Sequence, residues 1–179
     1  KYCELKSDGE YKIKDGKENH LTRLSMHEFF LYTSNPLSLL EFNDIVASIE
    51  EMPLHQNVHV LLSSFAVVGE DNQLLNIVLY IEGGNHPIFH CIAKNTAFES
   101  DFNYENKLRL FSQKKLPDDE EHKDHANFIS SLKSSVSTNS IFEVMTLGGA
   151  KFTQIIDICF DHVHSHGLIL LKNHLNNID

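Results

Sequence analysis

The fold is decided by the stretch from Val58 to Ala93, VHVLLSSFAVVGEDNQLLNIVLYIEGGNHPIFHCIA. It contains three apolar runs rich in valine, isoleucine, leucine and phenylalanine, at 58–68, 74–81 and 88–93. The runs are separated by residues typical of turns, Gly-Glu-Asp-Asn at 69–72 and Gly-Gly-Asn at 83–85. Short apolar runs bounded by such turns predict an antiparallel β-meander of three strands.

The middle run predicts a strand that is covered on both sides. Successive side chains of a strand point to opposite faces of the sheet. One face of this strand carries Leu75, Ile77, Leu79 and Ile81, and the other carries Leu74, Val78 and Tyr80. A solvent-exposed face would carry polar residues instead. We therefore expect another element to pack on each face of the sheet.

Two helices are predicted before the meander. Ser25-Met26-His27-Glu28 matches a capping box and predicts a short aromatic helix at 26–33. Asn35-Pro36 starts a second helix, because proline is tolerated at the first helical position. The apolar residues of this helix recur at helical spacing and form one face, Leu39, Phe42, Val46 and Ile49. Met52-Pro53 ends the helix.

Two further helices and one strand are predicted after the meander. Pro117 followed by four acidic residues is typical of a helix N-terminus, and an apolar stripe continues to Val136. Residues 141–147 predict a strand, and Gly148-Gly149 a turn into a helix at 151–166. Gly167 is the expected C-cap, and residue 168 starts a separate element. The predicted fold class is α+β, an antiparallel β-meander packed against helices in the order α-α-β-β-β-α-β-α.

The chain is predicted to contain one domain. Residues 25–179 form this α+β domain, and residues 1–24 form a charged lead-in. Two short segments of the lead-in, 3–6 and 11–14, predict a short strand or a small hairpin, and a frayed lead-in is the alternative. A chain of 179 residues fits a single domain, because domains commonly have about 100–200 residues.

The composition favours a protein partner over a polyanion. The net charge is −10, with 15 basic and 25 acidic residues, so nucleic acid and anionic membrane would meet a repulsive field. No apolar run approaches the ~20 residues that cross a bilayer, and no membrane insertion is expected. Three widely spaced cysteines suit reduced thiols in a cytoplasmic protein. Basic or amphipathic segments of other proteins are the expected partners.

A histidine cluster near the C-terminus supports an alternative function. On a helix, His162 and His166 lie four residues apart on one face, a workable zinc-binding pair that Asp161 could complete. A metalloprotease helix would carry glutamate where Val163 stands. Histidines at a helix C-terminus also interact favourably with the helix dipole. The alternative function is a metal-dependent hydrolase that uses His162, His166 and an acidic residue, Asp161 or Asp157.

No catalytic residue and no cofactor are predicted. The Gly148-Gly149 turn lacks the upstream glycine of a phosphate-binding loop. His90 and Cys91 are neighbours on a predicted strand, so they point to opposite faces and cannot act as base and nucleophile. The sequence therefore favours a non-enzymatic protein. A domain that binds a small ligand between sheet and helices is a third hypothesis.

A surplus of apolar side chains predicts a protein-binding surface. Phe29, Phe30, Leu31 and Tyr32 are consecutive on a short predicted helix, so they cannot all face one core. An exposed apolar patch marks a binding site for another protein. The predicted protein-binding residues are Phe29, Phe30, Tyr32, Ile77, Leu79 and Ile81.

In size, acidity and predicted element order, residues 25–166 resemble the small acidic chaperones of bacterial secretion systems. The core of these chaperones is a helix, three strands and a helix. Among them, the chain is most similar to the adaptors of type IVB secretion, a subtype of type IV secretion. The resemblance implies a cytoplasmic adaptor, associated with virulence, that holds effector segments and forms hetero-oligomers with its partners. Two features depart from the pattern, namely the extra leading helix and the residues after Gly167.

Overall fold

The structure is a computed structural model, and it describes residues 3–5, 11–13, 17–26, 31, 35–68, 73–94, 109–110, 136–137, 140–158 and 166–176. The first elements are β1 (Cys3–Leu5), β2 (Tyr11–Ile13), β3 (Thr22–Ser25), β4 (Leu37–Ser38) and α1 (Leu39–Glu50). The meander follows as β5 (Val58–Val68), β6 (Gln73–Glu82) and β7 (Ile88–Ala93). The last elements are β8 (Arg109–Leu110), β9 (Val136–Ser137), β10 (Ile141–Met145), β11 (Lys151–Ile155) and α4 (His166–Asn176).

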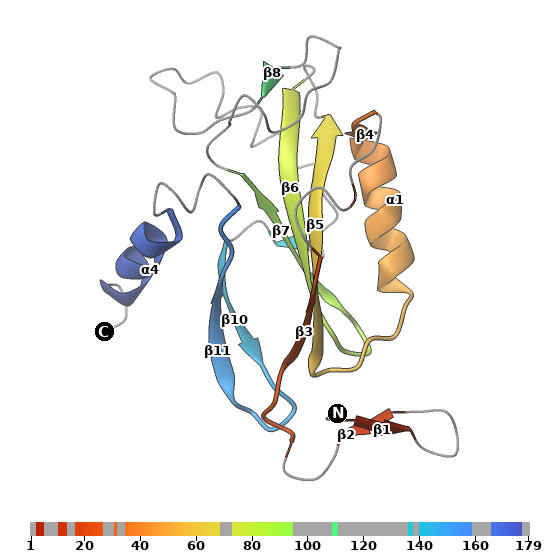
Figure 1. Cartoon of the computed structure of the whole chain (residues 1–179), viewed down its shortest axis with the longest axis vertical. Coiled ribbons are helices and arrows are strands. Elements are labelled where there is room, and N and C mark those ends of the chain that lie inside the picture. Colours follow the sequence, from red (N-terminus) through yellow and green to blue (C-terminus); the bar gives the residue numbers. More distant parts are fainter. Residues whose placement is uncertain are drawn as a thin grey trace.

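The predicted meander is confirmed and forms the middle of the main sheet (Figure 1). β5 pairs with β6, and β6 with β7, both antiparallel. The strand order is β3-β5-β6-β7-β9, with β4 also on β5 and β8 on β6. β3 and β4 run parallel to β5 near its two ends, with Thr22 opposite Val58 and Leu37 opposite Val67. The sheet is therefore mixed, with an antiparallel centre.

Helix α1 covers one face of this sheet (Figure 1). Its N-cap is Ser38, whose hydroxyl accepts a hydrogen bond from the Glu41 backbone N–H (3.2 Å). The Glu41 carboxylate in turn accepts from the Ser38 backbone N–H (2.8 Å), which completes a capping box. These bonds to Ser38 lower the pKa of Glu41. The helix predicted from Asn35-Pro36 is thus present and begins one turn later, where the chain can be capped.

The core between α1 and the sheet is apolar. Its helix residues are Phe42 and Val46, and its sheet residues are Phe65, Val67, Leu75, Ile77, Leu79, Ile81, Phe89 and Cys91. The rings of Phe42 and Phe65 meet edge to face, with centroids 5.7 Å apart. Burial raises the pKa of the Cys91 thiol far above its ordinary value, so this cysteine is a neutral core residue.

A hairpin of β10 and β11 covers the opposite face. Phe142 and Val144 from β10, with Ile156 and Ile158 after β11, pack against Val78, Tyr80 and Ile92 of the sheet. The expectation that both faces of the middle strand are covered is therefore confirmed. The layers are a helix, the main sheet and a two-stranded hairpin.

The helix predicted at 151–166 is wrong in its first part, because β11 is a strand. Gly149 adopts a positive φ of 85°, which L-residues rarely adopt. The Thr146 carbonyl accepts a hydrogen bond from the Gly149 N–H (2.9 Å), so the chain turns back tightly. Lys151 then lies opposite Met145 in an antiparallel pair. A nearby partner strand overrides the helical spacing of Phe152, Ile155 and Ile156.

The α+β class is confirmed in its coarse form, a mixed sheet with few helices, but the predicted order is not. Between β7 and α4 the described elements are all strands. The hairpin predicted in the lead-in is present, because β1 and β2 pair antiparallel. β3 ends at Ser25 and pairs with β5, so the main sheet begins at Thr22.

Other predictions fall at or beyond the limits of the described residues. Most of the predicted helix at 26–33, and all but the last position of the one from 117 to 136, lie outside the described residues. Gly167 stands in the first turn of α4 and is not a C-cap. Within the described part of the chain, no helix is long and apolar enough to cross a membrane.

Candidate functional site

The two faces of the main sheet differ in chemistry. The face under α1 is apolar, whereas the face toward the β10–β11 hairpin carries the buried polar residues of the sheet. These are His59, Ser63, Ser64, Asn76, His90 and Lys94. Burying polar groups costs free energy unless they are hydrogen-bonded. We call this side of the sheet the polar face. Because it gathers several buried polar residues, it is the candidate functional site.

One end of the polar face holds His59 and Tyr80, both fully buried. The Tyr80 hydroxyl lies 2.7 Å from Nδ1 of His59. The Arg23 guanidinium of β3 lies over the Tyr80 ring, 5.3 Å from its centroid, at cation–π distance. Arg23 also donates a hydrogen bond to Gln154 of β11. Arg23 therefore connects the edge strand β3 to Tyr80 of β6 and to β11 of the hairpin.

Burial keeps the side chains of His59 and Tyr80 uncharged. Burial lowers the pKa of His59, and Arg23 and His90 act in the same direction, against Glu82. Burial likewise raises the pKa of Tyr80, and the cationic Arg23 opposes this rise. A neutral histidine and a protonated tyrosine are therefore the forms that the folded chain prefers at neutral pH.

His90 occupies the next position on the polar face. Its Nε2 lies 2.5 Å from a carboxylate oxygen of Glu82, within charge-assisted hydrogen-bonding distance. Its ring stacks on Phe142 of β10, with centroids 3.6 Å apart and planes at 10°. The buried Nδ1 atom makes no hydrogen bond. This histidine is held in one orientation by a carboxylate and a ring, which is the geometry of a fixed core polar group.

The other end of the polar face contains a β-bulge. The register between β5 and β6 shifts by one residue between Leu62 and Phe65. Leu61 lies on the hairpin side before the bulge and Ala66 on the same side after it, so Ser63 and Ser64 both turn toward the polar face. They line a cavity of about 140 Å³ with Val78 and with residues 156–158.

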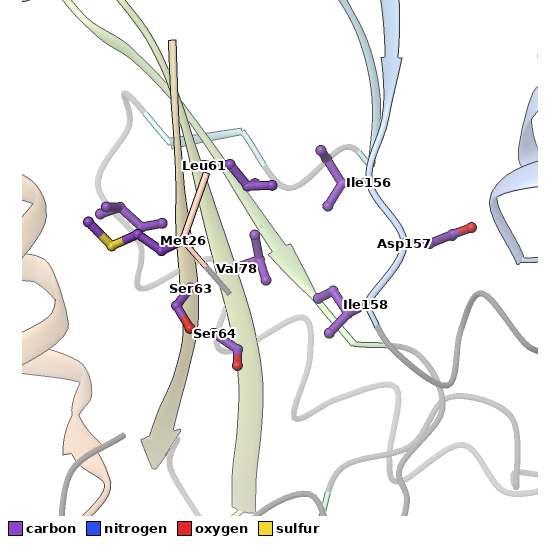
Figure 2. A pocket seen from close by; sticks show the side chains of 9 residues that line it. Met26, Leu61, Ser63, Ser64, Val78, Ile156, Asp157 and Ile158 are labelled. Carbon is purple, nitrogen blue, oxygen red and sulfur yellow. The ribbon is translucent and has the colours of Figure 1, made fainter. Parts of the chain in front are cut away.

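Figure 2 shows how this cavity is built. The side chains of Ile156 and Ile158 point toward the sheet, where Leu61 and Val78 lie (Figure 2). Asp157 points away from the sheet, on the side of α4 (Figure 2). Side chains 156 to 158 thus alternate between the two sides, so the chain stays extended beyond the end of β11. The cavity is thus apolar on its hairpin side, and on its β5 side it combines two leucines with the hydroxyls of Ser63 and Ser64.

A second, open depression of about 470 Å³ lies at the opposite end, beside β10. We call it the β10 groove. It is lined by the β6–β7 turn at 83–86, by Glu82 and Ile88 beside the turn, and by Glu143 and Met145 of β10. Ile88 and Met145 are 52% and 55% exposed, so both offer apolar surface to the groove. Glu143 forms a surface ion pair with Lys151 (3.5 Å).

The predicted binding residues of the sheet are not on the surface. Ile77, Leu79 and Ile81 are buried beneath α1, because their face is the one that the helix covers. Phe29, Phe30 and Tyr32 lie outside the described residues. The sheet face under α1 is therefore not available to a partner in the folded chain.

The predicted metal ligands are not brought together among the described residues. Asp161 and His162 lie outside them, and His166 is the first residue of α4. Within the described ranges, no group of three or more histidine, cysteine, aspartate or glutamate side chains could hold a metal ion. The metal site stays a prediction.

The polar face is not predicted by the sequence. Its signal was present as polar residues inside otherwise apolar runs, such as Ser63-Ser64, Asn76 and His90. Each is unremarkable alone. Only the pairing register places them on one side of one sheet.

The buried His59 predicts a loss of stability in mild acid. Its folded-state pKa lies below its ordinary value of 6.5, so below that pH the unfolded chain binds the proton more readily than the folded one. Proton uptake then favours unfolding, and stability is lost as the pH falls from 6.5 toward the folded pKa. Denaturant unfolding across this range should show a smaller pH slope for His59→Gln than for the unmodified protein. The exposed His20→Gln is the control, and equal slopes for all three proteins would contradict the prediction.

No family model, no curated protein and no solved structure matches this chain.

Proposed function

We propose that this protein is a non-enzymatic adaptor that binds a basic, amphipathic segment of another protein in the β10 groove. The observation that carries the proposal is the combination of exposed Ile88 and Met145 with the carboxylates of Glu82 and Glu143 in one depression. Apolar anchors surrounded by charge are the usual anatomy of a protein-binding site.

The charge of the groove favours a cationic partner. The whole chain carries a net charge of −10, which speeds the encounter with basic segments. The Glu143–Lys151 pair is exposed on both sides, and such pairs contribute only about 0–1 kcal/mol. A lysine or arginine of the partner can therefore replace Lys151 beside Glu143 at little cost.

The proposed surface differs from the one expected from sequence. The face with Ile77, Leu79 and Ile81 is occupied by α1, so α1 fills the place that a partner was expected to take. The order α1-β5-β6-β7 matches the first four elements of the secretion-chaperone core that the chain resembles. Effector segments of a bacterial secretion system are accordingly the partner class that we propose.

A labelled synthetic peptide tests this proposal by fluorescence polarisation. The peptide carries lysine on one helical face and leucine on the other, and a second peptide has glutamate in place of lysine. We expect the lysine peptide to bind, with weaker binding as salt rises, and the glutamate peptide to bind at least about tenfold more weakly (about 1.4 kcal/mol). Equal binding of the two peptides would overturn the proposed charge preference.

Variants then locate the site. Met145→Ser and Glu143→Lys should each weaken binding of the lysine peptide, Met145→Ser by removing an anchor and Glu143→Lys by like-charge repulsion. The matched control is Leu40→Ser, which removes a similarly exposed apolar side chain from α1. If Leu40→Ser weakens binding as much as Met145→Ser does, the β10 groove is not the binding site.

A further inference from the structure

The bulge end of the polar face holds buried polar atoms without hydrogen bonds. Ser64 is 1% exposed and its hydroxyl makes no hydrogen bond. Asn76 is 6% exposed, and neither its amide oxygen nor its amide nitrogen makes one. Native chains rarely leave such groups unsatisfied, because each costs free energy. Among the described residues nothing pairs with these atoms, so a molecule bound at this end of the face would satisfy them.

The strand register places these groups side by side. Asn76 lies opposite Ala66 of β5, two positions beyond the bulge. On its other side, the Lys94 backbone N–H donates to the Asn76 carbonyl (2.8 Å), so Lys94 is the cross-strand neighbour of Asn76. Lys94 is also buried. One end of the face therefore combines two neutral hydrogen-bond donors with a cation.

The adjoining cavity is small and open to solvent on one side. Its volume is about 140 Å³, and an enclosed cavity of ~150 Å³ accepts benzene, so a body of this size fits inside it. Leu61, Val78, Ile156 and Ile158 make its walls apolar, and Ser64 opens into it from the bulge. The one acidic lining residue, Asp157, directs its side chain away from the sheet (Figure 2).

We propose that this end of the polar face binds a small monocarboxylic acid with a compact apolar body. The body, a phenyl ring or a short branched alkyl chain, occupies the cavity between the sheet and residues 156–158. The carboxylate accepts a hydrogen bond from the Ser64 hydroxyl, which lines the cavity, and a second from the Asn76 amide nitrogen, which lies outside the lining on the same face of the sheet. A β-bulge is a common device for aiming side chains at a ligand. The site is separate from the β10 groove and does not depend on it.

Isothermal titration calorimetry with benzoate and isovalerate tests this site in the full chain. The neutral isosteres benzamide and isovaleramide serve as matched probes. We expect the acids to bind and the amides to bind at least about tenfold more weakly. Binding of the amides as tight as that of the acids, or no measurable binding of either acid, would overturn the proposal.

Two substitutions connect binding to the unsatisfied atoms. Asn76→Leu replaces a polar side chain by an apolar one of similar size, and Ser64→Ala removes the buried hydroxyl. Each should abolish or weaken acid binding at least tenfold while leaving the Tm of the ligand-free protein equal or higher, because an unpaired buried group is lost. Ser64→Ala removes a single atom and carries the test if Asn76→Leu fails to fold.

Ser48→Ala on the exposed side of α1 is the control, and Met145→Ser should leave acid binding unchanged. Acid binding that survives both core substitutions refutes this site.

Discussion

Replacing Phe42 with alanine is expected to lower the free energy of unfolding by about 3–5 kcal/mol. Phe42 is fully buried between α1 and the sheet, and its ring meets Phe65 edge to face. Alanine leaves a cavity that neighbouring strands cannot fill, since they are paired on both sides. The higher helix propensity of alanine offsets only about 0.5 kcal/mol of this loss. Urea unfolding followed by circular dichroism measures the change.

The control for this substitution lies on the same helix. Leu40 is 71% exposed, so Leu40→Ala should change the free energy of unfolding by no more than about 0.5 kcal/mol. Phe42 packs in the core that buries Ile77, Leu79 and Ile81. A larger effect at Phe42 than at Leu40 would therefore support the conclusion that α1 covers these three residues and keeps them from a partner. Equal effects at Phe42 and Leu40 would show that α1 does not cover this face.

Gly83→Ala is expected to destabilise the fold by at least about 2 kcal/mol. A Cβ atom at position 83 would lie 2.1 Å from the His55 carbonyl oxygen and 2.2 Å from that of Val58. Both are backbone atoms, so no side-chain rotation relieves the clash. The same region is tied by hydrogen bonds from Val58 N–H to His55 (2.8 Å) and from Gly84 N–H to Leu54 (3.0 Å). The start of β5 or the β6–β7 turn must therefore move.

Asn85→Ala is the matched control, because Asn85 is exposed in the same turn. We expect a change of about 0.5 kcal/mol or less, and thermal unfolding of both variants compares them directly. The substitution at Gly83 should also weaken peptide binding, since Gly83 lines the β10 groove. A Gly83→Ala protein as stable as Asn85→Ala would mean that the turn does not approach residues 55–58 as closely as described.

The proposed binding surface could not be predicted from the sequence. Exposure is a property of the packed chain, and the residues of the sheet that were predicted to bind a partner, Ile77, Leu79 and Ile81, are buried in the core with α1. Ile88 and Met145 look like any other strand residues in the sequence. They become a candidate surface only because the β6–β7 turn and β10 come together in space.

Local sequence determined the β5–β6–β7 meander, helix α1 and the need for a cover on each face of the sheet. Apolar periodicity and turn residues act over a few positions, so they are legible without a structure. The tertiary structure alone decided that 151–155 is a strand, because β10 supplies the hydrogen bonds that an isolated helix would supply internally. It also decided that His59, Ser64, Asn76 and His90 share one buried face. Strand register sets this arrangement, and register depends on contacts between residues far apart in the chain.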